Sequence, residues 1–354
     1  MRLQSLYLHN FRCYEEGYFE FCPHLNLIFG PNARGKTSLL EAIRVLMIGR
    51  SFRTIQSNDL IKNQTTGYHL EVHFAKHGID QKLRIAGNTT ERKIFLNSAP
   101  LGSLSNLLGL IPGVVQTPDD INLIKGPPQL RRQFLDIQIA QIDPLYVHHL
   151  TRFNRAMRQR NQLLRTKNLV SIEPWEHEMS QSAAYIISRR LSTIQNLQTN
   201  CQTFYTELTG EETLLTLKYR TNPSDLTNPE SIKCYFLKQY QKNRDREKVL
   251  GYTLAGPHKD DFTIAINGQD VRFFASEGQQ RSCATALHFA EWENLYLTGV
   301  EKPIFLMDDV GMSLDKDRSK RLLLQLFKLG QVFLTTTDQS LFDYYPGEKK
   351  AFSI

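Results

Sequence analysis

Eight consecutive residues near the N-terminus constrain this chain more than any other segment. Positions 30–37 read Gly-Pro-Asn-Ala-Arg-Gly-Lys-Thr and match the spacing G-x-x-x-x-G-K-T of a phosphate-binding loop. In such a loop, backbone N–H groups surround a β-phosphate, the lysine reaches the β- and γ-phosphate oxygens, and the threonine hydroxyl contacts magnesium. The sequence therefore predicts a site for ATP and Mg²⁺ formed by Gly30, Pro31, Asn32, Ala33, Arg34, Gly35, Lys36, Thr37 and Ser38.

The segments around this loop have the pattern that a phosphate-binding loop requires. Residues 25–29 are apolar and predict a buried strand, and residues 36–47 place their apolar side chains on one side of a predicted helix. A helix that begins at the loop also directs its positive end toward a bound phosphate. Further strands are predicted at 3–8 and 18–21 and a tight turn at 76–78.

Two later segments supply groups suited to phosphate chemistry. The apolar strand predicted at 304–307 ends in Asp308 and Asp309, and ligands bind at the carboxyl ends of strands in parallel sheets. We expect Asp308 to hold magnesium and Asp309 to polarise the attacking water. Residues 276–279, Ser-Glu-Gly-Gln, begin a helix predicted at 279–296, so they form either an anion site or a plain helix cap.

The chain also contains a second, basic part. At 354 residues it exceeds what one hydrophobic core usually supports. Its net charge is +7, and residues 121–250 hold 19 lysines and arginines against 12 aspartates and glutamates. This stretch is helical in pattern, whereas strands and helices alternate before and after it, with a strand at 262–266, a turn at 267–268, a helix at 317–328 and a strand at 332–335. We therefore expect an α/β nucleotide domain made of 1–120 and 251–354, with 121–250 inserted as a mainly helical lobe.

The excess of positive charge in the inserted lobe predicts a polyanionic partner. Along 145–167, apolar side chains fall on one helical face, and Arg152, Arg155 and Arg158 fall on the other. Residues 144–172 contain no acidic residue, although charged faces usually mix both signs. We expect the three arginines to bind DNA phosphates; a solvated basic surface is the alternative.

Composition argues against several classes of protein. No apolar run approaches the length needed to span a bilayer, and the N-terminus lacks the apolar core of a signal peptide. The five cysteines are odd in number and include no C-x-x-C pair, which argues against a disulfide framework or a zinc site. We expect a cytoplasmic chain without a membrane partner.

The order of the motifs resembles ATPase heads of the ABC type, which include the SMC proteins. After the phosphate loop come S-x-G-Q at 276–279, Asp308-Asp309, Ser-Leu-Asp at 313–315 and Thr-Thr-Thr-Asp at 335–338. Further matches are similar to the RecF family of bacterial recombination mediators, and they span nearly the whole chain. They lie at Leu8, Asn10, Phe11 and Arg12, and at 49–53, 131–136, 160–161, 256–261 and 278–281.

The resemblance implies an α/β P-loop NTPase of the ABC-ATPase head type that forms an ATP-dependent homodimer. In this dimer, the γ-phosphate bound by Lys36 of one subunit would contact the signature of the other, at Ser276, Gly278 and Gln279. The resemblance also places Arg12 among the nucleotide-binding residues.

The resemblance further implies roles for two more residues. Gln116 falls in the region of the ABC glutamine loop, as a magnesium or water contact. Thr337 takes the switch position that is histidine in many ABC heads. Threonine cannot shuttle a proton as imidazole does, so we expect slow hydrolysis with Lys36, Asp309 and Thr337 as catalytic groups.

The same resemblance implies DNA partners and companion proteins. It predicts binding to gapped DNA or single-strand/double-strand junctions, cooperation with RecR and RecO, and help in loading RecA. Ala33, Arg34 and the segment 312–315, Met-Ser-Leu-Asp, depart from the family's usual residues.

Two alternative functions remain open. One is a non-hydrolysing nucleotide-gated DNA scaffold, which a hydrolysis assay with DNA present would distinguish. The other is an ABC transporter ATPase subunit, which would have a full L-S-G-G-Q signature and a switch histidine; the sequence has neither.

Overall fold

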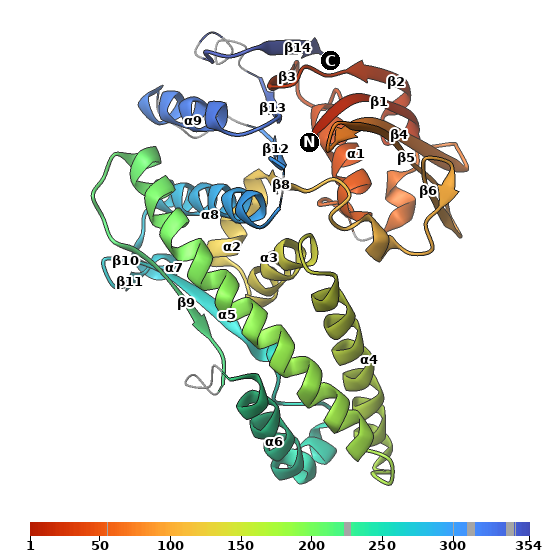
Figure 1. Cartoon of the computed structure of the whole chain (residues 1–354), viewed down its shortest axis with the longest axis vertical. Coiled ribbons are helices and arrows are strands. Elements are labelled where there is room, and N and C mark those ends of the chain that lie inside the picture. Colours follow the sequence, from red (N-terminus) through yellow and green to blue (C-terminus); the bar gives the residue numbers. More distant parts are fainter. Residues whose placement is uncertain (55, 223–227, 300, 310–315, 338–342, 344) are drawn as a thin grey trace. The chain divides into compact units, whose positions relative to one another are not determined.

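A computed structural model describes residues 1–354 apart from positions 55, 223–227, 300, 310–315, 338–342 and 344. The described residues fall into two units, both drawn in Figure 1. Unit 1 comprises Met1–Asp120, Thr203–Glu212 and Ser276–Ile354, and unit 2 comprises Ile121–Gln202 and Thr213–Ala275. Each unit therefore combines segments that are far apart in the sequence.

Unit 1 contains a five-stranded sheet in which all neighbouring strands are parallel. In spatial order its strands are β14 (Lys349–Ser353), β3 (Leu25–Phe29), β13 (Val332–Thr336), β12 (Ile304–Met307) and β8 (Gly113–Gln116). The side chains of β3, β13 and β12 are almost all buried, as expected for strands covered on both faces. Because these strands point the same way, the loops that follow them leave from one edge of the sheet.

A six-stranded antiparallel sheet forms a further layer of unit 1. Its strands are β2 (Tyr14–Glu20), β1 (Arg2–Phe11), β4 (Gly67–Lys76), β5 (Ile79–Asn88), β6 (Arg92–Leu96) and β7 (Ala99–Pro100). Helix α1 (Lys36–Ile48) contacts β13 of the parallel sheet and also β1, β4 and β5. Because both sheets cover α1, nearly all of its side chains are buried.

Two further helices lie wholly within unit 1. They are α8 (Glu277–Thr298), which packs on β8, and α9 (Lys316–Lys328). In Figure 1, α9 and α1 lie on opposite sides of the parallel sheet. Short 3₁₀ turns occur at Ser57–Leu60, Leu104–Leu107 and Pro118–Asp120. The helices and strands predicted for this part of the chain are confirmed, with boundary differences of one to a few residues at most ends.

Two tight turns confirm the signals that predicted them. His77 and Gly78, between β4 and β5, have φ angles of 53° and 72°. Asn267 and Gly268, between β10 (Asp261–Ile266) and β11 (Gln269–Asp270), have φ angles of 51° and 81°. Positive φ at both central residues matches the twist of the flanking strands and favours glycine and asparagine.

Unit 2 is mainly helical. Its helices are α2 (Ile121–Lys125), α3 (Pro128–Ala140), α4 (Pro144–Thr166), α5 (Glu173–Thr209, of which the last residues belong to unit 1), α6 (Pro229–Leu250) and α7 (Val271–Phe274), with a 3₁₀ turn at Pro257–Lys259. Proline begins α3, α4 and α6, where its missing N–H costs no helical hydrogen bond. The side chains of Asp143 and Asn228 cap α4 and α6.

The structure corrects the sequence-based boundary at residue 250. Strand β10 pairs with β9 (Leu215–Arg220), a strand that was not predicted within the helical stretch. This pairing joins residues 251–275 to unit 2, although the sequence assigned them to the nucleotide domain. The pattern of 121–250 hid β9 because the strand is short and lies between two long helices.

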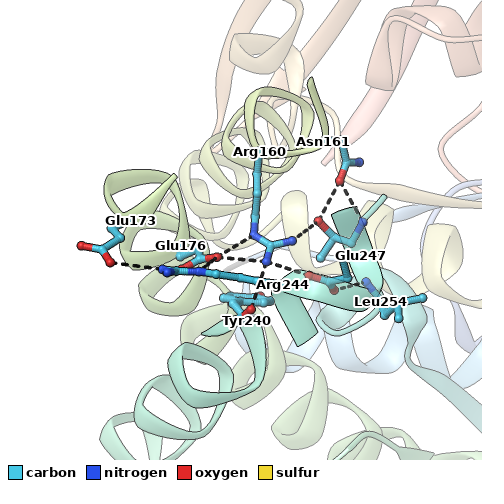
Figure 2. A network of polar contacts seen from close by, with 9 residues as sticks. Arg160, Asn161, Glu173, Glu176, Tyr240, Arg244, Glu247 and Leu254 are labelled. Carbon is cyan, nitrogen blue, oxygen red and sulfur yellow. Dashed lines mark hydrogen bonds and ion pairs between the residues drawn. The ribbon is translucent and has the colours of Figure 1, made fainter. Parts of the chain in front are cut away.

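The interior of unit 2 contains a buried arginine, Arg160 of α4. Figure 2 shows its guanidinium between the carboxylates of Glu176 and Glu247. The two ion pairs measure 3.0 and 2.7 Å, and none of the three side chains is exposed to solvent. Arg160 also donates to the hydroxyl of Thr253, and Arg244 pairs with the outer side of Glu176. The network ties α4, α5 and α6 together and balances its charges, as buried ions require.

A second buried network involves Arg190 of α5. Its guanidinium pairs with Asp136 of α3 at 2.7 Å and donates to the hydroxyl oxygen of Tyr146 in α4. Nearby, Arg131 forms two hydrogen bonds with Asp261, at 2.7 and 3.0 Å. Several segments that resemble the RecF family therefore stabilise the interior of unit 2.

Across the described residues, no helix combines the length and the apolar character that crossing a bilayer demands.

We predict that Arg160→Met destabilises the protein by about 3–5 kcal/mol, because the carboxylates of Glu176 and Glu247 then stay buried without their arginine. Denaturant unfolding should show this loss. The exposed Arg158 of the same helix provides the matched control, since Arg158→Met should change the free energy of unfolding by less than about 0.5 kcal/mol. Equal effects of both substitutions would contradict the structural role of the network.

Candidate nucleotide site

The phosphate-binding loop connects β3 to α1 and has the backbone geometry that its glycines permit. Gly35 precedes α1 with a φ of 114°, and a side chain there would clash with Cys13, whose Sγ would lie 2.8 Å from the added Cβ. No side chain caps this end of α1, and its first turn contains no acidic residue. The first N–H groups of α1 therefore remain available to an anion.

Lys36 bends back over the loop. Its ammonium donates to the backbone oxygens of Gly30 and Pro31, at 2.6 and 2.9 Å, and the residue is largely buried. The ammonium of Lys36 is therefore held inside the curve of the phosphate-binding loop. The position suits the predicted contact of Lys36 with phosphate oxygens.

Ala33, one of the residues that depart from the family's usual ones, has an unusual backbone conformation. Ala33 has a φ of 65°, in the left-handed region where glycine is favoured. A Cβ in this region costs roughly 1–2 kcal/mol. The loop thus keeps the shape that a glycine would adopt, with the strain of an alanine, and the side chain of Arg34 is exposed.

Asp308 lies at the end of β12, where two threonine hydroxyls converge on it. Thr37 Oγ1 donates to Asp308 Oδ1 at 3.0 Å, and Thr335 Oγ1 donates to the same atom at 2.6 Å. Burial raises the pKa of Asp308, and the two hydroxyls counteract this effect by stabilising the carboxylate. The structure therefore brings together Thr37 and Asp308, the two residues predicted to contact magnesium, and it adds Thr335, which the sequence did not place there.

Asp309 and Thr337 lie at the same edge of the parallel sheet. Asp309 has a φ of 55°, and its N–H donates to Thr335 Oγ1 at 2.7 Å. This hydrogen bond holds the backbone in a turn directly after β12. Thr337 is the residue after β13, and its side chain is exposed.

Gln116 ends β8, next to Asp308. Its backbone oxygen accepts a hydrogen bond from the N–H of Asp308 at 2.9 Å. Its Nε2 donates to Thr285 of α8, and its Oε1 is buried without a hydrogen-bond partner in the part of the chain that the structure describes. A buried carbonyl oxygen of this kind is suited to receive a ligand.

These oxygen donors meet the requirements of magnesium. The hydroxyl of Thr37, the carboxylate of Asp308 and the unpaired Oε1 of Gln116 are the hard ligands that Mg²⁺ prefers. Mg²⁺ usually keeps water and phosphate oxygens in its shell, so a small number of protein ligands is enough. The residues present therefore fit the predicted ion.

Arg12 pairs with a residue that the sequence analysis missed. Its guanidinium forms two hydrogen bonds with Glu41 of α1, at 2.9 and 2.6 Å. Glu41 is fully buried and also accepts from Ser51 and pairs with Arg53 at 3.7 Å. Arg12 thus lies beside the second turn of the loop helix. In the sequence, Glu41 is a single glutamate within a predicted apolar helix, and nothing near it in the chain indicates its pairing with Arg12.

The signature at 276–279 begins α8 as a capping box. The N–H of Gln279 donates to Ser276 Oγ at 3.3 Å, and the Gln279 side chain accepts from the N–H of Ser276 at 3.0 Å. The cap and the anion site are compatible, because the Ser276 hydroxyl accepts in the cap and can still donate its proton. Ser276 is exposed, and Gly278 is half-buried.

The three candidate DNA-binding arginines differ in their surroundings. Arg152 pairs with Glu178 of α5 at 3.1 Å, so an acidic side chain from another helix enters the face that the sequence left free of acids. Arg155 and Arg158 are exposed, and within the described residues no ion-pair partner faces either of them. The basic face of α4 is therefore centred on Arg155 and Arg158.

Two motif segments extend beyond the described residues. The positions 312–315 lie wholly outside them, as does Asp338 of the segment 335–338. The geometry of the nucleotide site thus rests on the loop, Gln116, Asp308, Asp309 and the end of β13.

Comparison with known proteins follows the same motifs. Residues 2–349 match the family model described as the RecF/RecN/SMC N terminal domain. The DNA replication and repair protein RecF of Protochlamydia amoebophila is 58% identical over 100% of this chain and 99% of the relative. The RecF protein of Chlamydia abortus is 36% identical over 95% of this chain and 92% of the relative.

Solved structures agree with these sequences. The recombination mediator protein RecF of the RecFOR pathway, solved as RecF-ATPrS, superimposes with a TM-score of 0.91 at 31% identity, covering 100% of this chain and 96% of that one. The RecF-ATP structure gives a TM-score of 0.89 at 31% identity, covering 96% and 92%. An SMC head bound to the C-winged helix domain of ScpA shares the fold, with a TM-score of 0.56 at 16% identity over 97% of this chain and 91% of that one.

These likenesses confirm the expected fold class, an α/β P-loop NTPase of the ABC-ATPase head type with an inserted lobe. The chain belongs to the RecF/RecN/SMC N-terminal domain family and, within it, to the RecF proteins.

Proposed function

We propose that this chain is an ATP-dependent DNA-binding recombination mediator of DNA repair. The observation that carries the proposal is the arrangement of the parallel sheet: β3, β13, β12 and β8 deliver the phosphate loop, Thr337, Asp308–Asp309 and Gln116 to one edge. This is the edge at which ligands bind in parallel sheets. The RecF relatives, one of them solved as RecF-ATP, support the nucleotide.

Each residue of the site has a distinct task in the proposed function. The N–H groups of the loop and of the start of α1 bind phosphate oxygens, and Lys36 adds a point charge to the β- and γ-phosphates. Thr37, Asp308 and Gln116 would hold magnesium. Magnesium, when bound, offsets the negative charge that grows on the phosphate oxygens during transfer.

Hydrolysis is proposed to be slow and to act as a timer. The carboxylate of Asp309 would orient the attacking water, and Thr337 would donate a hydrogen bond to the γ-phosphate. Neither residue supplies the imidazole that passes protons in many ABC heads. The presence of Asp309 favours a weak, DNA-stimulated ATPase over the non-hydrolysing scaffold.

ATP is proposed to act as a clamp between two copies of the chain. The Ser276 hydroxyl and the N–H groups at the start of α8 would face the γ-phosphate bound by the partner subunit. The capping box supports this role because it fixes the helix end while leaving the hydroxyl proton free to donate. Monomers should therefore hydrolyse ATP poorly.

The basic face of α4 is proposed to contact DNA. Arg155 and Arg158 lie one turn apart on the exposed side of the helix and can reach successive phosphates without reading bases. Because the chain is similar to the recombination mediators of the RecFOR pathway, we propose that it acts in the cytoplasm on gapped or junction DNA. We propose RecR and RecO as its partners and RecA as the protein that it helps to load.

We predict that Lys36→Ala abolishes ATP-driven dimerisation and hydrolysis and weakens ATP binding roughly tenfold to hundredfold, as expected for a lost charge-assisted contact. Lys36→Arg should bind ATP and hydrolyse it poorly, because the planar guanidinium places its charge differently. Titration calorimetry and sedimentation with ATP measure these effects. Lys93→Ala, at an exposed lysine of the same unit, is the control. Normal dimerisation of Lys36→Ala would refute the assignment.

Two substitutions should separate chemistry from pairing. Asp309→Asn removes the carboxylate that orients water, so hydrolysis should fall by about 10² to 10⁴-fold while ATP-bound dimers persist. Ser276→Arg should bind ATP and fail to dimerise, because a bulky cation occupies the place of the partner's γ-phosphate. Sedimentation with ATP distinguishes them, and identical behaviour of the two variants would contradict a site shared between subunits.

The basic face can be tested by the salt dependence of DNA binding. Replacing Arg155 and Arg158 by alanine should reduce the slope of log K against log salt by roughly two, since each phosphate contact on duplex DNA contributes about 0.9. Adding Arg152→Ala should reduce the slope further by less than about 0.9, the contribution of one phosphate contact, because Arg152 already pairs with Glu178. ATP binding should stay unchanged.

The double variant Lys93→Ala/Lys320→Ala removes the same charge from exposed positions in unit 1 and is the matched control. If the slope is unchanged in the variant that lacks Arg155 and Arg158, this face is only exposed to solvent and does not contact DNA phosphates.

A further inference from the structure

One end of the Gln116 side chain is held, and the other end has no partner. Its Nε2 donates to Thr285 Oγ1 at 2.7 Å. Its Oε1 is buried and lacks a hydrogen-bond partner among the residues that the structure describes. Buried carbonyl oxygens usually find a partner, and this one belongs to a residue beside Asp308, so we consider a ligand of the nucleotide site as its partner.

The backbone of Gln116 fixes where this oxygen can act. Gln116 is in register with Met307 in the parallel pair of β8 and β12, and its backbone oxygen binds the N–H of Asp308. Asp308 in turn accepts a hydrogen bond from Thr37 at 3.0 Å. The amide of Gln116 therefore branches from the strand next to the two proposed magnesium ligands.

Helix α8 holds the segment after Gln116 at a second point. His288, one turn beyond Thr285, hydrogen-bonds Asp120 at 3.0 Å through Nε2 and Glu291 at 3.0 Å through Nδ1. Asp120 also accepts the N–H of Thr117 at 2.6 Å. The two carboxylates outweigh burial and raise the pKa of His288 to about 9. One face of α8 thus ties down both the amide of Gln116 and the turn that follows it.

We infer that Thr285 is a positioning residue for Gln116: its hydroxyl holds the amide nitrogen, which leaves Oε1 available to the cation bound by Thr37 and Asp308. A glutamine amide can exchange its two ends by a half-turn about its last bond. In the observed orientation the Thr285 hydroxyl accepts from Nε2, and Oε1 is the end left without a partner among the described residues. Thr285 acts through Gln116 without contacting the ligand, and the inference rests on the proposed binding of MgATP.

The experiment measures the Mg²⁺ concentration that half-saturates the effect of Mg²⁺ on ATP binding, without reference to hydrolysis. Thr285→Val keeps the shape of the side chain and removes the hydroxyl, so it should raise this concentration roughly threefold to tenfold, the range for one lost hydrogen bond. Thr285→Ser should restore the wild-type value. ATP binding in the absence of Mg²⁺ should be the same in all three proteins.

A double substitution shows whether Thr285 works through Gln116. Gln116→Ala should raise the Mg²⁺ requirement at least as much as Thr285→Val, and the combined variant should match Gln116→Ala alone. Thr298→Val is the matched control, since Thr298 lies on the same helix and, among the described residues, donates to the backbone oxygens of Asn294 and Leu295. Thermal unfolding checks each variant, and Thr285→Ala replaces Thr285→Val if the latter does not fold.

The possible failures can be distinguished. If ATP binding by the wild-type protein does not depend on Mg²⁺, the proposed metal site is wrong and this inference fails with it. A wild type that responds to Mg²⁺, together with a Thr285→Val variant of unchanged requirement, would overturn the positioning role alone. Additive effects of Thr285→Val and Gln116→Ala would also overturn it.

Discussion

The parallel pairing of β3, β13, β12 and β8 is the constraint on which the candidate site depends. Its register places Met307 beside Gln116 and beside Leu334, so the residues that follow these strands meet at one edge. Hydrogen bonds from Thr335 to Asp308, and from the N–H of Asp309 to Thr335, then fix the ends of two neighbouring strands to each other. A shift of one residue would turn each of these side chains to the opposite face of the sheet.

Charge is managed differently in the two units. In unit 1, the charged groups of the site lie at strand ends and helix ends, where N–H groups and hydroxyls surround them. In unit 2, Arg160 and Arg190 lie in the interior and take carboxylates from several helices. These two arginines are therefore neutralised inside the lobe. Other arginines, such as Arg155 and Arg158, lie at exposed positions, and these are the ones proposed to contact DNA.

The parts of the structure that the sequence predicted are local. The strand, loop and helix around Lys36, the acidic end of β12 and the turns at Gly78 and Gly268 each depend on residues close together in the chain. Such features follow from periodicity and from the φ angles that glycine allows. The sequence did not reveal which residues of neighbouring strands in the parallel sheet are paired. It supported only the general rule that ligands bind at the carboxyl edge of such a sheet.

The features that the sequence did not reveal involve partners far away in the chain. Arg152 meets Glu178 from the next helix, Arg12 meets Glu41, and Gln116 meets Thr285 across more than a hundred residues. No periodicity within one segment encodes such a meeting. Strand β9 is a different case: Leu215, Leu217 and Tyr219 alternate with polar residues as in a strand, but the segment is short and lies between two long helices.

The capping box at the start of α8 affects the entropy of association. Ser276 and Gln279 hold each other's backbone N–H groups, so the first turn of α8 is already ordered in a single chain. A surface that is ordered beforehand loses little conformational freedom when it meets a partner. In the proposed symmetric dimer this saving would occur twice, once at each nucleotide. A small difference in the order of one helix end would then count twice in the equilibrium between monomer and dimer.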